Sequence, residues 1–208
     1  ALTNFRDPAS TRSQAPSRGE IIPDFLLSDQ APADFARDLA GRQPPYNDFN
    51  LLLGQGDELL WYSSRQQQVE RVAPGTHGLC NRHLDTPWPK VEQGRKRLAH
   101  TVAAASPGQP PDPESLFRVL ADPAAFPAQT LPDTGVGPEW EKKLSALFIK
   151  DPVYGTRCTT LVTVSDSGHI RVIERTHPGP GSPALKQPEN RTFAVRPGKG
   201  IWPLDPPP

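Results

Sequence analysis

The sequence contains no methionine, only two cysteines and no long apolar run. No run approaches the ~18 apolar residues of a membrane-spanning helix and no signal segment opens the chain, so we expect no membrane span. Cys80 and Cys158 are too few for a disulfide scaffold, which predicts a reduced, cytoplasmic setting. Because methionine is missing even at position 1, we expect that a leading segment has been removed.

Net charge is absent as well, since 23 Lys and Arg residues balance 23 Asp and Glu residues. A chain without net charge has no long-range field that attracts nucleic acid, so we predict no nucleic-acid partner. Proline is abundant, with 27 of the 208 residues. The length suits a single domain with a buried core, which we place at 1–195 and follow with a proline-rich tail at 196–208.

Apolar residues repeat at helical spacing in several segments. The first expected helix is 21–26, which follows a capping box at 17–20, and the second ends at Leu39. The third is 90–105, the fourth starts at Pro113, and the fifth is 140–148. Ser28 or Asp29 should cap the second helix and Asp112 the fourth, because their side chains accept backbone hydrogen bonds. The pattern is strongest from Trp140 to Phe148.

Other segments alternate as strands do. We expect one hairpin from 49–53 and 58–63, extended by 69–72, and a second from 159–164 and 169–175. Residues 193–195 are expected to form a last edge strand. The hairpins should form sheets with an apolar face, and the amphipathic helices can cover that face. Together these elements predict an α+β fold.

Three segments are unusually dense in polar residues: ALTNFRDP at the start, GLCNRHLDTPWPK at 78–90, and YGTRCTT before a strand. Asparagine beside glycine or proline is typical of turns, and an arginine at a strand entrance is usually solvated. Each segment alone is therefore compatible with a structural role.

Taken in order, eight segments resemble one family. They are ALTNFRDP, SRGE, YNDFNLLLG, GLCNRHLDTPWPK, LPDTGV, EWEKKLSALF, YGTRCTTL and IERT. This series resembles the NRDE family, also called the transport and Golgi organisation family, over residues 1–176. The Met-Cys-Thr start and the Asn-Arg-Asp-Glu motif of that family are absent here.

The resemblance implies a fold and a chemistry. The family is similar to the N-terminal-nucleophile hydrolases, so we expect a four-layer αββα sandwich whose first strands are missing. In the branch that includes bile-salt hydrolases, an N-terminal cysteine attacks an amide carbonyl and fixed donors stabilise the oxyanion. The resemblance assigns Asn4 and Asn81 to the active site, with Asn81 as the oxyanion donor, and Arg157 to the surroundings of the nucleophile.

Ala1 offers an α-amine but no nucleophilic side chain, so the chain as given cannot run this mechanism. Two accounts stay open: a fragment whose nucleophile lies upstream, or a lineage that has lost catalysis. The missing methionine and a start inside a family motif favour the fragment.

His77 and Cys80 suggest another site. A cysteine near His77 and His83 is a candidate alternative nucleophile, although a lone cysteine is more often a buried apolar residue. Histidine and cysteine are also axial ligands of haem iron, which makes haem a candidate carried ligand at His77 and Cys80. Zinc would need two further ligands, so we expect no metal site there.

Two functions therefore compete. Members of the resembled family are associated with haem trafficking and with lipid and secretory homeostasis, which favours the handling of a small ligand, haem or an acyl compound, on a hydrolase scaffold. The alternative is a cysteine hydrolase or acyltransferase that acts on amide or acyl bonds. In both cases we expect Asn4, Asn81 and Arg157 to meet around one cavity.

Overall fold

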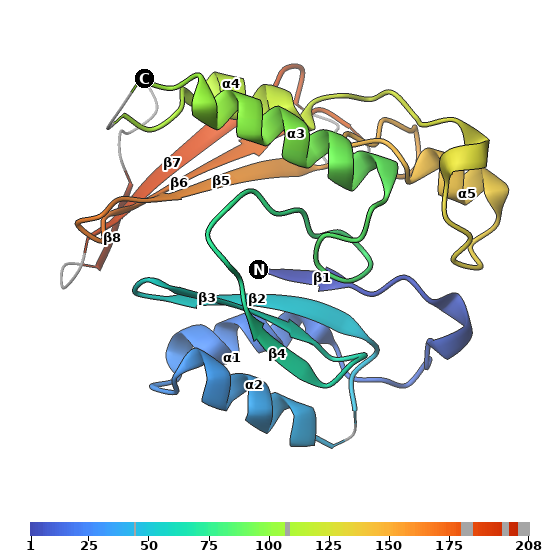
Figure 1. Ribbon diagram of the computed structural model, residues 1–208, viewed down its shortest axis with the longest axis horizontal. Helices are drawn as coiled ribbons and strands as arrows, with labels where there is room; N and C mark the ends of the chain where they lie inside the picture. Colours follow the sequence, from blue (N-terminus) through green and yellow to red (C-terminus); the bar gives the residue numbers. More distant parts are fainter. Residues whose placement is uncertain (44, 107–108, 180–184, 197–199, 204–208) are drawn as a thin grey trace. The chain divides into compact units, whose positions relative to one another are not determined.

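The computed structural model describes residues 1–43, 45–106, 109–179, 185–196 and 200–203. They form an α+β structure with two antiparallel four-stranded sheets (Figure 1), as predicted, while the four-layer sandwich stays a prediction. The chain divides into two compact units, one made of residues 1–92 and 130–141, the other of 93–129 and 142–208. The single domain expected over 1–195 stays a prediction.

The sheet of the first unit has the strand order β1-β2-β3-β4. Its strands are Leu2–Asn4, Phe49–Gln55, Glu58–Ser63 and Gln68–Arg71. β2 and β3 form the expected hairpin, and Gly56 in its turn has φ 57°, a conformation that favours glycine. β1 pairs with β2 at the edge of the sheet, so Asn4 lies at that edge.

Helices α1 (Ile21–Leu27) and α2 (Pro32–Gly41) cover one face of this sheet (Figure 1). The predicted caps of the second helix are wrong, because α2 begins after Ala31 and Ser28 Oγ instead donates to the Phe25 carbonyl at the end of α1. The core between helices and sheet consists of Ile21, Phe35, Ala36, Leu39, Phe49, Leu51, Leu53 and Tyr62. Burial of each large side chain contributes about 1.5–3 kcal/mol.

The second unit contains the sheet β5-β6-β7-β8. Its strands are Cys158–Val164, Ile170–Thr176, Glu189–Arg196 and Gly200–Pro203. β7 is an inner strand and not the expected edge strand, because β8 pairs with it. β8 falls in the predicted proline-rich tail; residues 197–199 and 204–208 of that tail lie outside the described residues.

Helices α3 (Pro89–Ala103) and α4 (Pro113–Leu120) are the long helices of this part of the chain, and α3 belongs to the second unit from Gln93 onward. Asp112 caps α4 as predicted, since its Oδ2 accepts from the Ser115 amide at 2.9 Å. Short 3₁₀ turns lie at Pro8–Ser10, Arg18–Glu20 and Ala128–Thr130. Within the described residues, every helix is too short or too polar to cross a bilayer.

Helix α5 (Pro138–Lys143) is shorter than the 140–148 expected from its apolar spacing. Ser145 Oγ donates to the Lys142 carbonyl at 2.7 Å and accepts from the Phe126 amide at 3.0 Å. The Phe148 amide donates to the Asp122 carbonyl at 2.9 Å. Side-chain and tertiary hydrogen bonds thus replace helical ones beyond Lys143.

Candidate functional site

Residues 80–82 lie along the first strand of the first unit. Thr3 Oγ1 donates to the Cys80 carbonyl at 2.8 Å, and the Arg6 amide donates to the Asn81 carbonyl at 2.8 Å. The fully buried Asn50 side chain, on β2, donates to the Arg82 carbonyl at 2.8 Å. The sheet therefore fixes the backbone of this predicted site segment.

Asn4 and Asn81, 77 positions apart in the chain, meet at this edge. Asn81 Nδ2 donates to the Asn4 carbonyl at 3.0 Å, and Asn81 Oδ1 accepts from Arg6 Nη2 at 3.2 Å. It is the backbone of Asn4, and not its side chain, that makes the contact. A carboxamide has two N–H donors, so the Asn81 amide retains one for a further acceptor.

A buried ion pair holds the arginine that orients Asn81. Arg6 Nη1 lies 2.9 Å from Glu141 Oε2, and the two side chains are only 9% and 5% exposed. Glu141 Oε1 also accepts from the Thr134 amide at 2.7 Å, and the Arg6 guanidinium lies over the Trp88 ring at 5.2 Å. Sequence reasoning missed Arg6 and Glu141 as site residues, although both fall in segments that resemble the family.

Cys80 is a partly buried free thiol. Burial raises its pKa, and the nearby positive charge of Lys90 only partly offsets this effect. Burial in turn lowers the pKa of Lys90. A thiol that stays protonated is a poor nucleophile, so these surroundings do not favour Cys80 as an alternative nucleophile.

Both ring nitrogens of His77 have partners. Nδ1 lies 2.6 Å from Asp85 Oδ2 and Nε2 lies 2.9 Å from the Ala73 carbonyl. Asp85 also accepts from the Gly78 amide at 2.8 Å, so the pair closes the loop of residues 77–85. Haem ligation by His77 and Cys80 stays a prediction. The described residues contain no cluster of three or more His, Cys, Asp and Glu side chains suited to a metal ion.

Arg157 lies in the second unit, just before β5, and lines a pocket of about 770 Å³ there. The pocket is otherwise mainly apolar, and its apolar lining residues are Phe148, Ile149, Pro152, Val153, Tyr154 and Pro178. Val153 is 87% exposed, which leaves an apolar side chain available at the wall. Because Arg157 belongs to the second unit, a cavity shared with Asn4 and Asn81 stays a prediction.

The loop that carries this pocket is held by its own backbone. The Thr156 amide donates to the Ile149 carbonyl at 2.8 Å, and the Ile149 amide donates to Thr156 Oγ1 at 3.0 Å. Gly155 is needed at its position, because a Cβ there would lie 2.8 Å from the Ile149 carbonyl oxygen. Within the described residues, no hydrogen bond or ion pair occupies the Arg157 side chain. Its guanidinium is therefore available to a ligand.

His177 also lines this pocket. Its ring packs edge-on against Phe148 at 4.7 Å, and its Nε2 lies 2.9 Å from Thr159 Oγ1. Burial and then the charge of Arg175 lower its pKa. A lowered pKa favours the neutral imidazole, whose ring forms part of the pocket wall.

Comparison with known proteins identifies the family. The model of the family described as Transport and Golgi organisation 2 matches residues 1–178. Transport and Golgi organization protein 2 homologs of Bos taurus and Homo sapiens are 32% and 33% identical to this chain over 188 residues. Each alignment covers 84% of this chain and 67% of the relative. The predicted family is thus confirmed, and the chain belongs to the Transport and Golgi organisation 2 family.

Proposed function

We propose that the protein handles an acyl compound, a lipid-like molecule with a carboxylate head, and binds it in the Arg157 pocket. The observation that carries this proposal is an apolar pocket of about 770 Å³ whose wall includes Arg157. The planar guanidinium fork matches a carboxylate, and a mainly apolar cavity of this size suits a small ligand. Lys150 and Asp151 line the same pocket. Because Asp151 is paired with Lys143 and accepts from the Val153 and Tyr154 amides, Lys150 adds a second positive charge to that of Arg157.

The scaffold that we propose is the four-layer αββα sandwich of the N-terminal-nucleophile hydrolases. Its support is that each unit contains a four-stranded antiparallel sheet, and that α1 and α2 cover one face of the first sheet. The relatives are named for transport and Golgi organisation, so we place the bound ligand in trafficking.

An acyl ligand is favoured over haem by the contacts of the histidines. His77 uses both ring nitrogens to close its own loop, and His177 in the Arg157 pocket is engaged by Thr159. A haem ligand needs a free imidazole nitrogen, so His77 cannot ligate haem without breaking an existing contact, whereas in His177 the contact engages Nε2 alone.

Titration of a fluorescent medium-chain fatty acid into the 208-residue chain tests the proposal. Arg157→Gln should weaken binding roughly tenfold or more, because it removes a charge-assisted hydrogen bond. Arg171→Gln is the matched control, since Arg171 is an exposed arginine outside this pocket. Equal affinities of the two variants, or no saturable binding, would contradict the proposal. A saturable Soret shift that is lost in His77→Ala would replace the acyl ligand by haem.

A second candidate is hydrolysis or transfer of an acyl group by a cysteine upstream of Ala1. The contact of Asn81 with residues 4–6 favours it, because an oxyanion site needs an amide that is already oriented and has an unused N–H. In a protein that includes this cysteine, Asn81→Ala should cost about 2.7–4 kcal/mol of transition-state stabilisation. Unchanged turnover would remove the role of Asn81.

A further inference from the structure

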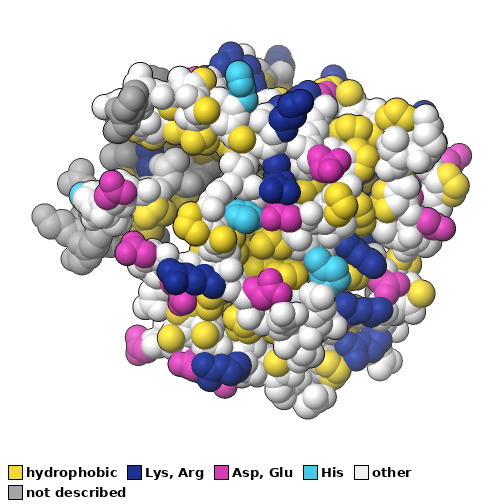
Figure 2. All heavy atoms as spheres, in the orientation of Figure 1, with side chains coloured by type: hydrophobic (Ala, Val, Ile, Leu, Met, Phe, Trp, Pro, Cys, Tyr) yellow, Lys and Arg dark blue, Asp and Glu magenta, His cyan; other side chains and the backbone are white. Residues whose placement is uncertain are grey.

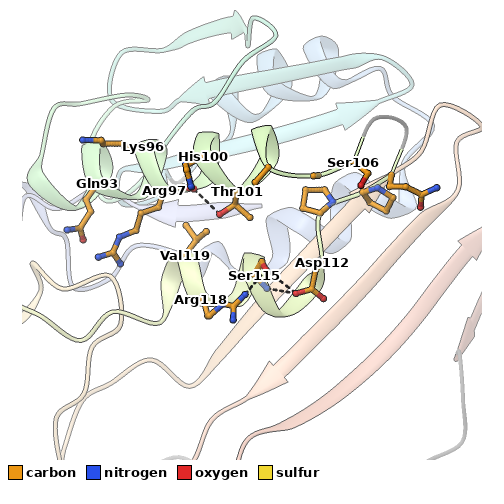
Figure 3. Close-up of a pocket in the computed structure, with 15 residues that line it drawn as sticks. Gln93, Lys96, Arg97, His100, Thr101, Ser106, Asp112, Ser115, Arg118 and Val119 are labelled. Atoms are coloured by element: carbon orange, nitrogen blue, oxygen red, sulfur yellow. Dashed lines mark hydrogen bonds between the residues drawn. The ribbon is translucent and has the colours of Figure 1, made fainter.

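Helices α3 and α4 of the second unit line a groove of about 910 Å³ (Figure 3). Lys96, Arg97 and His100 contribute to it from α3, and Ser115 and Arg118 from α4. The groove shares no lining residue with the Arg157 pocket. It lies outside every segment to which a role has been given above.

Helical spacing places these side chains on the groove. Lys96, Arg97 and His100 follow each other at i, i+1 and i+4, so Lys96 and His100 are neighbours on one face of α3. Ser115 and Arg118 are likewise neighbours at i and i+3 on α4. Figure 3 shows Arg97 of α3 directed toward α4, whereas Lys96 extends on the other side of α3 in this view. Cations from two separate helices therefore line one groove, with Lys96 reaching it by its long side chain.

Two of the cations are held in place and one is unengaged. Arg97 Nη2 lies 2.6 Å from Asp122 Oδ2, and Arg118 Nη2 donates to Ser115 Oγ at 2.6 Å. Lys96 makes no side-chain hydrogen bond or ion pair with the residues that the structure describes, and it is exposed. Arg118 is exposed too, and a guanidinium has five N–H donors, so most of its donors remain available.

Acidic side chains neutralise only part of this groove: Asp122 pairs with Arg97, and Asp112 is close enough to Arg118 for their charges to attract. Among its described lining residues the carboxylate is Asp112, whose Oδ2 accepts from both the amide and the hydroxyl of Ser115 to cap α4. The wall also has an apolar part, which includes Ala104 and the buried Val119. The groove thus combines an excess of positive charge with an apolar surface.

We infer that this groove is a binding site for a phosphorylated small molecule that has an apolar part. A phosphoryl group carries about −1.5 to −2 charges and three acceptor oxygens, which suits the long side chains of Lys96 and Arg118, both of which line the groove. A carboxylate carries one charge and is matched by a single arginine fork, so it would leave the second helix unused. The volume of about 910 Å³ is that of a ligand-sized cavity.

Isothermal titration of the 208-residue chain with phenyl phosphate tests this inference. We expect saturable binding that is weakened roughly tenfold or more by Lys96→Gln and by Arg118→Gln, because each removes a charge-assisted hydrogen bond. Lys142→Gln is the control, since Lys142 is an exposed lysine of the same unit outside the groove. Inorganic phosphate should bind more weakly because it lacks the apolar ring, and benzoate should bind more weakly because it lacks the phosphoryl group.

Three results would overturn the inference: no saturable binding of phenyl phosphate, unchanged binding in both groove variants, or benzoate binding as tight as phenyl phosphate. Lys96 and Arg118 are exposed, so the variants should melt at the temperature of the parent chain, and a thermal melt verifies folding. Arg157→Gln should leave phenyl phosphate binding intact, which separates this site from the proposed acyl pocket.

Discussion

Arg6 and Glu141 form an ion pair across 135 positions of the chain, with Arg6 Nη1 2.9 Å from Glu141 Oε2. Through its other terminal nitrogen, Arg6 also binds Asn81 Oδ1. One guanidinium thus connects the residues that follow β1, the loop of Asn81 and Glu141 of helix α5, all of which belong to the first unit. The orientation of the Asn81 amide depends on this pair.

Removal of Glu141 should destabilise the protein strongly. Glu141→Ala leaves the buried Arg6 charge without compensation, which costs about 3–5 kcal/mol. Urea unfolding of the variant measures this cost. Asp34→Ala is the control, because the Arg37–Asp34 pair is 69% and 53% exposed and its loss should cost no more than about 1 kcal/mol. Equal costs in the two variants would show that the Arg6–Glu141 pair is not effectively buried.

The two cysteines should differ in reactivity. Burial raises the pKa of the Cys80 thiol, whereas Cys158 is exposed. In iodoacetamide labelling near pH 7, the Cys158→Ser variant should therefore react roughly tenfold more slowly than Cys80→Ser. Lys90→Gln, added to Cys158→Ser, should slow labelling further, because it removes a charge that lowers the pKa of Cys80. Faster labelling of Cys80 than of Cys158 would contradict this account.

Gly155 should not tolerate a methyl group. Gly155→Ala places a Cβ 2.8 Å from the Ile149 carbonyl oxygen, a backbone atom that cannot rotate away, so we expect a loss of about 1–3 kcal/mol. Thermal unfolding measures it. Gly179→Ala is the matched control in the same pocket, since a Cβ there meets nothing within 4 Å. The prediction fails if both variants melt like the parent chain.

The stability that Asp151 contributes, in the loop of the Arg157 pocket, should decrease at acid pH. The hydrogen bond from Lys143, followed by those from the Val153 and Tyr154 amides, lowers the pKa of Asp151 from 3.8 to about 2. A carboxyl group whose pKa is lower in the folded than in the unfolded state stabilises the fold at pH values above its unfolded-state pKa. This contribution is lost as the pH falls through the folded-state pKa. The melting temperatures of the parent chain and Asp151→Asn should therefore converge between pH 4 and pH 2. A constant difference over that range would exclude the linkage.

The distribution of surface charge affects how an anionic ligand can be recognised. Figure 2 shows positive and negative side chains interspersed on the face that it draws, in keeping with the balanced composition. An anionic ligand would therefore be recognised by local groups, which in our proposals are Arg157 and Lys96, and not through a long-range field.

Local sequence patterns were sufficient for the hairpins β2–β3 and β5–β6 and for the Asp112 cap of α4. These features depend on neighbours in the chain, through side-chain alternation and a cap three residues from its donor. The same reasoning failed for α5, where Ser145 binds the Phe126 amide, a partner 19 positions away that no local pattern reveals. The ordered motifs identified the family, again from sequence alone.

Only the tertiary structure decided which polar groups are engaged and which are free. The pairing of Arg6 with Glu141, and of His77 with Asp85 and the Ala73 carbonyl, follows from how strands and loops pack. The same packing leaves the Arg157 guanidinium at an apolar wall and brings Lys96 and Arg118 to one groove. A sequence specifies the donors and acceptors of each residue, but the packing of distant segments determines which of them are satisfied within the protein and which are available to a ligand.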